Sequence, residues 1–180
     1  GTDTVSNQYG AGGTTGVMVR LATTSAQGTG GSGTDTLSGF EKLTGSVNAD
    51  RLGGNASANT LSGLAGNDTL AGGAGRDVLT GGSGGDVFDF DVATHSGPAA
   101  ATRDVITDFV RGQDRIDLST IDARSGTGAN EAFVFIGTAA FSSTNASGQL
   151  RFGGGVVYVS TDADAPAEFG IALTQLVHRP

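Results

Sequence analysis

A nine-residue repeat is the feature of this sequence that most restricts its fold. Three blocks follow one another without a gap, at residues 63–71, 72–80 and 81–89. Each block has Gly at its first and fourth positions, Asp at its sixth position and a large apolar residue at its eighth position. A flexible Gly-rich linker does not need an acid and an apolar residue at fixed places. The repeat therefore predicts a solenoid in which each block supplies one turn and one short strand.

Weaker copies of the block precede the regular ones. Residues 45–52 and 54–61 keep the register, although the second copy has Asn59 where Asp is expected. A further copy at residues 30–37, which contains Asp35, lies out of register. We therefore expect a roll over residues 1–92, degenerate over 1–44 and regular over 45–89.

The spacing of the acids indicates where a cation would bind. Two blocks make one coil, so alternate blocks stack on the same side, with their strands about 4.8 Å apart. This stacking pairs Asp50 with Asp68, Asp68 with Asp86, and Asn59 with Asp77. Two carboxylates that are ~5 Å apart repel by roughly 1 kcal/mol in water and by more when they are buried. A cation between the turns would reverse the sign of this interaction.

Calcium suits such a site because it accepts six to eight oxygens from carboxylates and backbone carbonyls together. The glycines let the turns adopt positive φ and bring carbonyls close to one another. We expect several Ca²⁺ ions, whose binding is coupled to folding. The site that involves Asn59 should bind calcium most weakly. The alternative interpretation of the repeats is a solenoid that stacks without metal. The predicted ligands are the side chains of Asp50, Asn59, Asp68, Asp77 and Asp86 and the turn residues Gly63, Ala65, Gly66, Gly72, Ala74, Gly75, Gly81, Ser83 and Gly84.

Composition excludes several other classes of protein. The net charge of −8 argues against a nucleic-acid partner, since a phosphate backbone requires a basic face. There is no Cys for a disulfide or a thiolate site, and no apolar run as long as a membrane span. The two histidines, His95 and His178, lie in no zinc-type cluster, and no nucleophile elbow is present. We therefore expect this module to be non-catalytic.

The composition and pattern of the sequence change after residue 92. Glycine becomes less frequent, and polar and apolar residues alternate over 104–109 and 114–118. Residues 131–136 predict a denser strand, 150–159 a hairpin and 169–173 a last strand. The predicted fold class is all-β: a calcium-binding parallel β-roll followed by a small antiparallel β domain over residues 93–180.

These repeats resemble the repeats-in-toxin family, also known for its haemolysin-type calcium-binding repeat. Residues 104–109, 112–119, 148–152 and 162–173 are similar to the C-terminal domain of serralysin-type metalloproteases, and the R-modules of mannuronan epimerases are similar here. The resemblance implies further calcium contacts from Asp104, Asp108 and Asp114, for which ordinary strand-end acids are the alternative. It also suggests a calcium site at Asp162, Asp164 and Glu168, for which a solvated turn is the alternative. The zinc motif of the proteases is absent.

The resemblance implies a function as well. In that family the repeats fold on calcium outside the cell, and the C-terminal region carries an uncleaved signal for a type I secretion system. We expect a calcium-triggered folding and type I secretion module at the C-terminus of a larger secreted bacterial protein. Residues 175–180 depart from the acidic and apolar ending that is common in the family. The alternative is attachment to a polysaccharide or a cell-surface layer through Arg151, Phe152 and Tyr158, although packing of a sheet face is the favoured explanation of these three residues.

Overall fold

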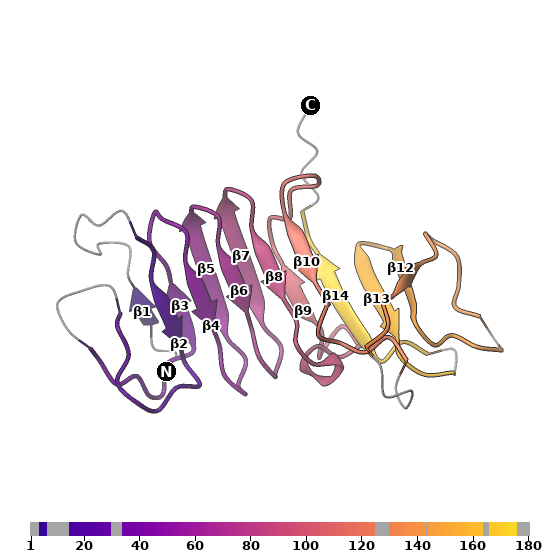
Figure 1. Cartoon of the computed structure of the whole chain (residues 1–180), viewed down its shortest axis with the longest axis horizontal. Helices are drawn as coiled ribbons and strands as arrows, with labels where there is room; N and C mark the ends of the chain where they lie inside the picture. Colours follow the sequence, from indigo (N-terminus) through magenta and orange to yellow (C-terminus); the bar gives the residue numbers. More distant parts are fainter. Residues whose placement is uncertain are drawn as a thin grey trace.

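The structure is a computed structural model that describes residues 4–6, 15–29, 34–124, 130–142, 144–163 and 166–175. Over these residues the chain forms an elongated stack of short strands (Figure 1). The only helical element described is a single 3-10 turn, η1 (Ala93–His95). Among the described residues, no helix is long and apolar enough to cross a membrane.

Two parallel sheets face each other and form the roll. The smaller sheet has the strand order β10-β8-β6-β4-β2, and the larger begins β1-β3-β5-β7-β9. Their strands are β1 (Thr4–Ser6), β2 (Met18–Arg20), β3 (Lys42–Thr44), β4 (Arg51–Gly53), β5 (Thr60–Ala65), β6 (Thr69–Ala71), β7 (Val78–Ser83), β8 (Val87–Asp89), β9 (Asp104–Ile106) and β10 (Arg115–Asp117).

The register of the regular strands is 18 residues, or two blocks per coil. Leu52 of β4 lies opposite Leu70 of β6, which lies opposite Phe88 of β8. In the other sheet, Leu61 of β5 lies opposite Leu79 of β7. The nine-residue spacing therefore predicts the coil correctly, since consecutive blocks alternate between the two sheets.

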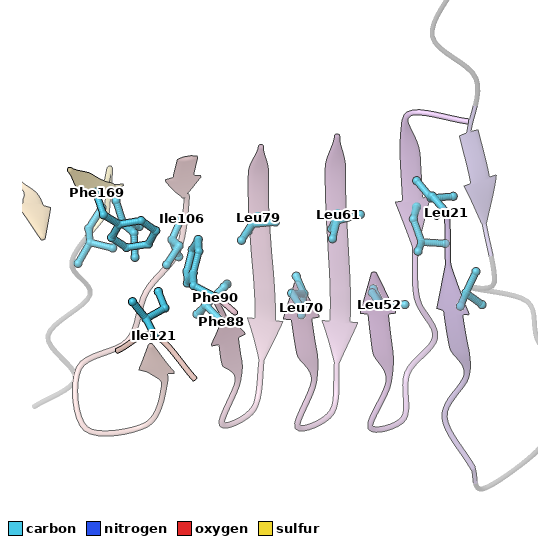
Figure 2. Close-up of a cluster of buried hydrophobic side chains, with 14 of the residues drawn as sticks. Leu21, Leu52, Leu61, Leu70, Leu79, Phe88, Phe90, Ile106, Ile121 and Phe169 are labelled. Atoms are coloured by element: carbon cyan, nitrogen blue, oxygen red, sulfur yellow. The ribbon is translucent and has the colours of Figure 1, made fainter. Parts of the chain in front are cut away.

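A narrow core runs along the axis of the roll. The residues at position eight of the blocks point inward from both sheets, as Figure 2 shows. Leu61, Leu70, Leu79 and Phe88 are fully buried. Burying one such side chain stabilises the fold by about 1.5–3 kcal/mol.

The degenerate N-terminal part also stacks on the roll, with insertions between its strands. β2 pairs with β4, and β3 pairs with β5. Leu43 of β3 is 1% exposed, so the short segment that interrupts the repeat register supplies the inward apolar residue. In the described part of the out-of-register copy, Asp35 is exposed and forms an isolated bridge with Gln27, whereas Leu37 is buried in the core.

Beyond the roll, the larger sheet continues as a mixed sheet in the order β14-β13-β12-β11. β14 (Phe169–Leu173) pairs with β9 in parallel, and the hairpin of β12 (Gln149–Gly153) and β13 (Val156–Ser160) follows in antiparallel pairing. The predicted fold class and the predicted hairpin are thus confirmed. The predicted strand over 131–136 is reduced to β11 (Val134–Phe135), whose two residues are 60% and 64% exposed, because the strand lies at the sheet edge.

The position of a domain boundary stays a proposal. We place it at residue 92, between the Gly-rich blocks and the C-terminal region. The two parallel sheets run on across this point through β9 and β10.

Candidate metal centre

Two rows of acidic turn residues run along opposite edges of the roll. We call them edge one (Asp50, Asp68, Asp86 and Asp114) and edge two (Asn59, Asp77 and Asp104). Within each row, the backbone N–H of one residue donates to Oδ1 of the next. These bonds are 2.8 Å for Asp50 to Asp68, 3.0 Å for Asp68 to Asp86, 3.0 Å for Asp86 to Asp114, 2.7 Å for Asn59 to Asp77 and 2.7 Å for Asp77 to Asp104.

The structure therefore brings together the pairs that the spacing predicts, although each pair is joined through one oxygen only. The second carboxylate oxygen is what distinguishes this arrangement. Oδ2 is buried and has no hydrogen-bond partner, within the described part of the chain, in Asp68, Asp77, Asp86 and Asp104. A buried polar atom that is left unpaired costs about 1–3 kcal/mol. Four such atoms in regular rows indicate that the turns are built for a group outside the protein.

The electrostatics agree with this interpretation. Burial, with smaller contributions from the neighbouring Asp50 and Asp86 carboxylates, raises the pKa of Asp68 from 3.8 to about 7. Burial likewise raises the pKa of Asp104 to about 7 and that of Asp77 to about 6. The pKa of Asp86 is raised for the same reason. The protein alone thus does not stabilise the charged form of these groups.

Carbonyl oxygens face the same spaces as the unpaired carboxylate oxygens. A Cβ built on Gly63 would collide with Asp68 Oδ2 and come within 2.6 Å of the Gly81 carbonyl oxygen. A Cβ on Gly45 would collide with Asp50 Oδ2 and lie 2.9 Å from the Gly63 carbonyl oxygen, although Asp50 Oδ2 already accepts a 2.6 Å bond from Ser46 N. Gly45 and Gly63, the first glycines of their blocks, therefore each keep open a space that is lined by a carboxylate and by a carbonyl of the next coil.

Edge two repeats this arrangement. A Cβ on Gly72 would collide with Asp77 Oδ2, and one on Gly54 would collide with the Gly72 carbonyl and with Asn59 Oδ1. Carboxylate and carbonyl oxygens together are the donor set that calcium prefers, so the residues present fit this ion. Among the described residues, no three His, Cys, Asp or Glu side chains gather into a metal-binding group, so carbonyls are a necessary part of any such site.

The fourth-position glycines allow the coils to stack closely. Gly66, Gly75 and Gly84 all have positive φ. A Cβ on Gly84 would collide with the Gly66 carbonyl oxygen of the coil below. Of the other predicted carbonyl ligands, Ser83 O accepts a 2.9 Å bond from Gly66 N. Ala65 and Ala74 lie in the same stacked turns.

The three acids that the family resemblance suggested lie on the last coil of the roll, but in different environments. Asp104 ends edge two and has an unpaired oxygen like the repeat acids. Asp108 instead accepts 3.0 and 2.7 Å bonds from the backbone N–H groups of Gly81 and Gly82. Asp114 Oδ2 accepts a 2.7 Å bond from Val110 N. Two of the three thus satisfy the backbone of the last turns directly.

Sequence reasoning left Glu41 without a role. Its carbonyl accepts bonds from Thr60 N at 2.8 Å and from Asn59 Nδ2 at 3.5 Å, so it takes the sixth position of its coil in edge two. The signal is Leu43, an apolar residue two places after the acid, as in every regular block. Sequence reasoning also missed the next partner of Asp77. The regular spacing places that partner 18 residues later, but Asp104 follows after 27 residues, which is three blocks.

The site suggested for Asp162, Asp164 and Glu168 is not assembled by the described residues. Glu168 Oε2 accepts a 2.7 Å bond from Thr161 N. Asp162 is exposed, and Asp164 lies outside the described residues.

A parallel β-roll with Gly-rich turns and one stacked acid per block defines a domain of the repeats-in-toxin type. The chain belongs to the family of serralysin C-terminal domains: the family described as peptidase M10 serralysin C terminal matches residues 10–174. This confirms the family resemblance drawn from the sequence. Among solved structures, the chain is similar to the AlgE6R3 subunit of the Azotobacter vinelandii mannuronan C5-epimerase. The two are 34% identical over 74% of this chain and 69% of that chain, with a TM-score of 0.46. No curated protein matches this chain.

Proposed function

We propose that this chain is a calcium-binding module that folds when calcium becomes available and that serves the type I secretion of a larger bacterial protein. The observation that carries the proposal is the rows of buried Oδ2 atoms without partners among the described residues; that of Asp68 faces a space that the Gly81 carbonyl oxygen also lines. Family membership supports the same conclusion.

The proposed ligands follow from the two edges. On edge one, Asp50, Asp68 and Asp86 would hold the ions together with the carbonyls of Gly63 and Gly81. On edge two, Asp77 and Asp104 would do so with the carbonyl of Gly72, and Asn59 would contribute a neutral oxygen. A bound cation would supply the positive charge that offsets the repulsion between stacked carboxylates.

The coupling to folding comes from the thin core. The core of the roll is narrow, and the net charge of −8 on the whole chain opposes compaction. In a compartment low in calcium, the chain would stay unfolded and could pass through a secretion channel, since it has no disulfide to hold it. Extracellular calcium modules bind at about 10⁻⁴–10⁻³ M, so the roll would fold outside the cell.

We further propose that the chain is non-catalytic and acts outside the cell. His95 lies half-buried in η1, where it lines a cavity together with Gly75 and Arg76, and His178 lies outside the described residues. Any enzyme activity would then belong to the parent protein.

A calcium titration followed by far-UV circular dichroism tests the metal part of the proposal. We expect a cooperative gain of β-structure at submillimolar to millimolar calcium and none with magnesium, which prefers a smaller octahedral site. A chain that is fully β-structured in chelator would contradict calcium-triggered folding.

The secretion part needs a separate test. A reporter fused to this chain should be exported by a type I system, and removal of residues 100–180 should abolish export. Unchanged export after that truncation would contradict the secretion role while leaving calcium binding intact.

A further inference from the structure

A second cluster of functional groups lies on the C-terminal hairpin. A groove of about 580 Å³ opens there between three loops. Arg151 of β12 and Tyr158 of β13, which are cross-strand partners, form its floor. Pro98, Phe141 and Pro166 belong to its walls. We call this the hairpin groove.

The floor of the hairpin groove is a stack of guanidinium groups and aromatic rings. The Arg151 guanidinium lies 4.9 Å from the centroid of the Tyr158 ring and 5.4 Å from that of Phe141. The Arg103 guanidinium lies 5.3 Å from the Tyr158 ring, and its Nη1 donates a 3.3 Å hydrogen bond to the Tyr158 hydroxyl. Stacking fixes the plane of a guanidinium and leaves its N–H groups free at the edge.

The charge of this cluster is not neutralised within the described part of the chain. Neither Arg103 nor Arg151 forms a salt bridge there, and Arg151 donates no hydrogen bond. Arg103 donates to the Pro98 carbonyl, and its Nε is buried without a partner. The chain has 18 acidic residues and only 10 basic ones, so two arginines on one ring that pair with no acid among the described residues are unexpected. Charge complementarity therefore favours an anionic ligand.

The lining of the groove identifies the rest of that ligand. Apart from Arg151 and Tyr158, the lining consists of Pro, Ala and Phe residues. A sugar would need hydrogen-bonding side chains or a free aromatic face, but guanidinium groups already stack on the Tyr158 ring. Phe152, which the sequence associated with Arg151 and Tyr158, instead packs against the hydrophobic core.

We infer that the hairpin groove binds a peptide segment of small apolar residues that carries one carboxylate, with Arg151 holding the carboxylate. A planar guanidinium and a carboxylate form two parallel hydrogen bonds, and the apolar walls cover the peptide body. Arg103 acts as a positioning residue that fixes Tyr158 and Pro98. This binding site is independent of the proposed calcium and secretion functions.

The chain offers a label-free readout of binding. It has no Trp, and Tyr9 is the only tyrosine besides Tyr158. In a Tyr9→Phe background, tyrosine emission therefore reports on the groove floor. The calcium-loaded full chain would be titrated with a pool of acetylated tripeptides of Ala, Pro, Leu and Val. One arm uses free acids, one uses the same peptides as amides, and one uses amides in which an Asp replaces one residue.

We expect a saturable emission change with the free acids, with the Asp amides or with both, at up to about 10 mM peptide, and none with the plain amides. The two carboxylate arms distinguish a chain terminus from an acidic side chain. Arg151→Gln should raise the dissociation constant by roughly tenfold or more, since a bidentate pair is lost. Arg151→Lys, which keeps the charge but not the planar fork, should weaken binding as well. Arg111→Gln removes the same charge at an exposed turn outside the groove and should leave binding unchanged.

Several results would overturn this inference. One is equal binding of the plain amides and the acids, and another is no binding of any arm to a chain that circular dichroism shows to be folded. Equal effects of Arg151→Gln and Arg111→Gln would also overturn it. A uronic-acid disaccharide serves as a further probe, and binding of this sugar without binding of the peptides would refute the peptide assignment. Failure of calcium-triggered folding would leave these outcomes readable, because they require only a folded chain.

Discussion

Replacement of Asp68 by Asn tests whether this residue acts as a metal ligand or only as a structural acid. Asp68 stands in the middle of edge one, between Asp50 and Asp86. Its Oδ1 accepts the 2.8 Å bond from Asp50 N, and its Oδ2 has no partner among the described residues. Asn keeps an acceptor for Asp50 and places an NH₂ group in the space that the Gly81 carbonyl also faces. The same substitution should therefore have opposite effects with and without calcium.

The magnitudes follow from the environment of the carboxylate. The pKa of about 7, raised from 3.8 chiefly by burial, corresponds to at most about 4 kcal/mol of destabilisation at pH 8 without metal. Water in the space between the turns screens part of this, so Asp68→Asn should stabilise the metal-free fold by about 1–2 kcal/mol. With calcium, losing one charge of a buried ion pair costs about 3–5 kcal/mol. The calcium midpoint should then rise by at least about 100-fold.

The assay is far-UV circular dichroism at pH 8 in chelator and across a calcium series. We expect more β-signal than the parent chain in chelator and a higher calcium midpoint. Asp35→Asn is the matched control, because it removes the same charge at an exposed position outside the roll. A loss of structure in chelator, or a calcium midpoint equal to that of Asp35→Asn, would refute the reasoning.

Three further outcomes can be checked. Asn59→Asp should restore a carboxylate beside Asp77. Calorimetry should then show tighter calcium binding, whereas the variant should be less structured than the parent chain in chelator. Unchanged binding heats would contradict this prediction. Leu64 has a positive φ of 83°, and the residue that pairs with it in the next coil is Gly82. Leu64→Gly should therefore stabilise the calcium-loaded roll by up to about 1 kcal/mol in urea unfolding. Gly82→Ala should destabilise it by at least about 1–2 kcal/mol. The pKa values of Asp77 and Asp104 are raised from 3.8 to about 6 and about 7, so their stabilising effect is full below pH ~4 and is lost as pH rises through the raised values. The metal-free chain should therefore show more β-signal by circular dichroism at pH 5 than at pH 8, and a fall in signal on acidification would contradict this.

The sequence predicts the regular part of the roll well, since a single rule sets both fold and site. The block length fixes the coil, so the pairs Asp50 with Asp68 and Asn59 with Asp77 follow from spacing alone. The C-terminal hairpin is predictable too, because Gly154 and Gly155, with φ of 60° and 76°, supply the turn that two such strands need.

The irregular coils could not be predicted, because insertions break the count that the rule depends on. Asp104 stacks on Asp77 across three blocks, which hides the pairing. Glu41 occupies a row position through its backbone carbonyl, and within this shortened block only the apolar Leu43 two places later marks that position. The hairpin groove likewise depends on loops that are far apart in sequence, so only the folded chain brings Pro98, Phe141 and Arg151 together.

The transition from parallel to antiparallel strands at β14 has a consequence for how such chains can vary in length. β9 closes the roll on one sheet, and β14 covers its free edge, so no further coil can be added at that end. Each regular coil contacts only its neighbours, with an offset of 18 residues. Deletion or duplication of one 18-residue unit within the regular blocks would leave the closing strands untouched. Homologous chains can therefore differ in the number of coils, and hence of metal sites, while they keep the same C-terminal end.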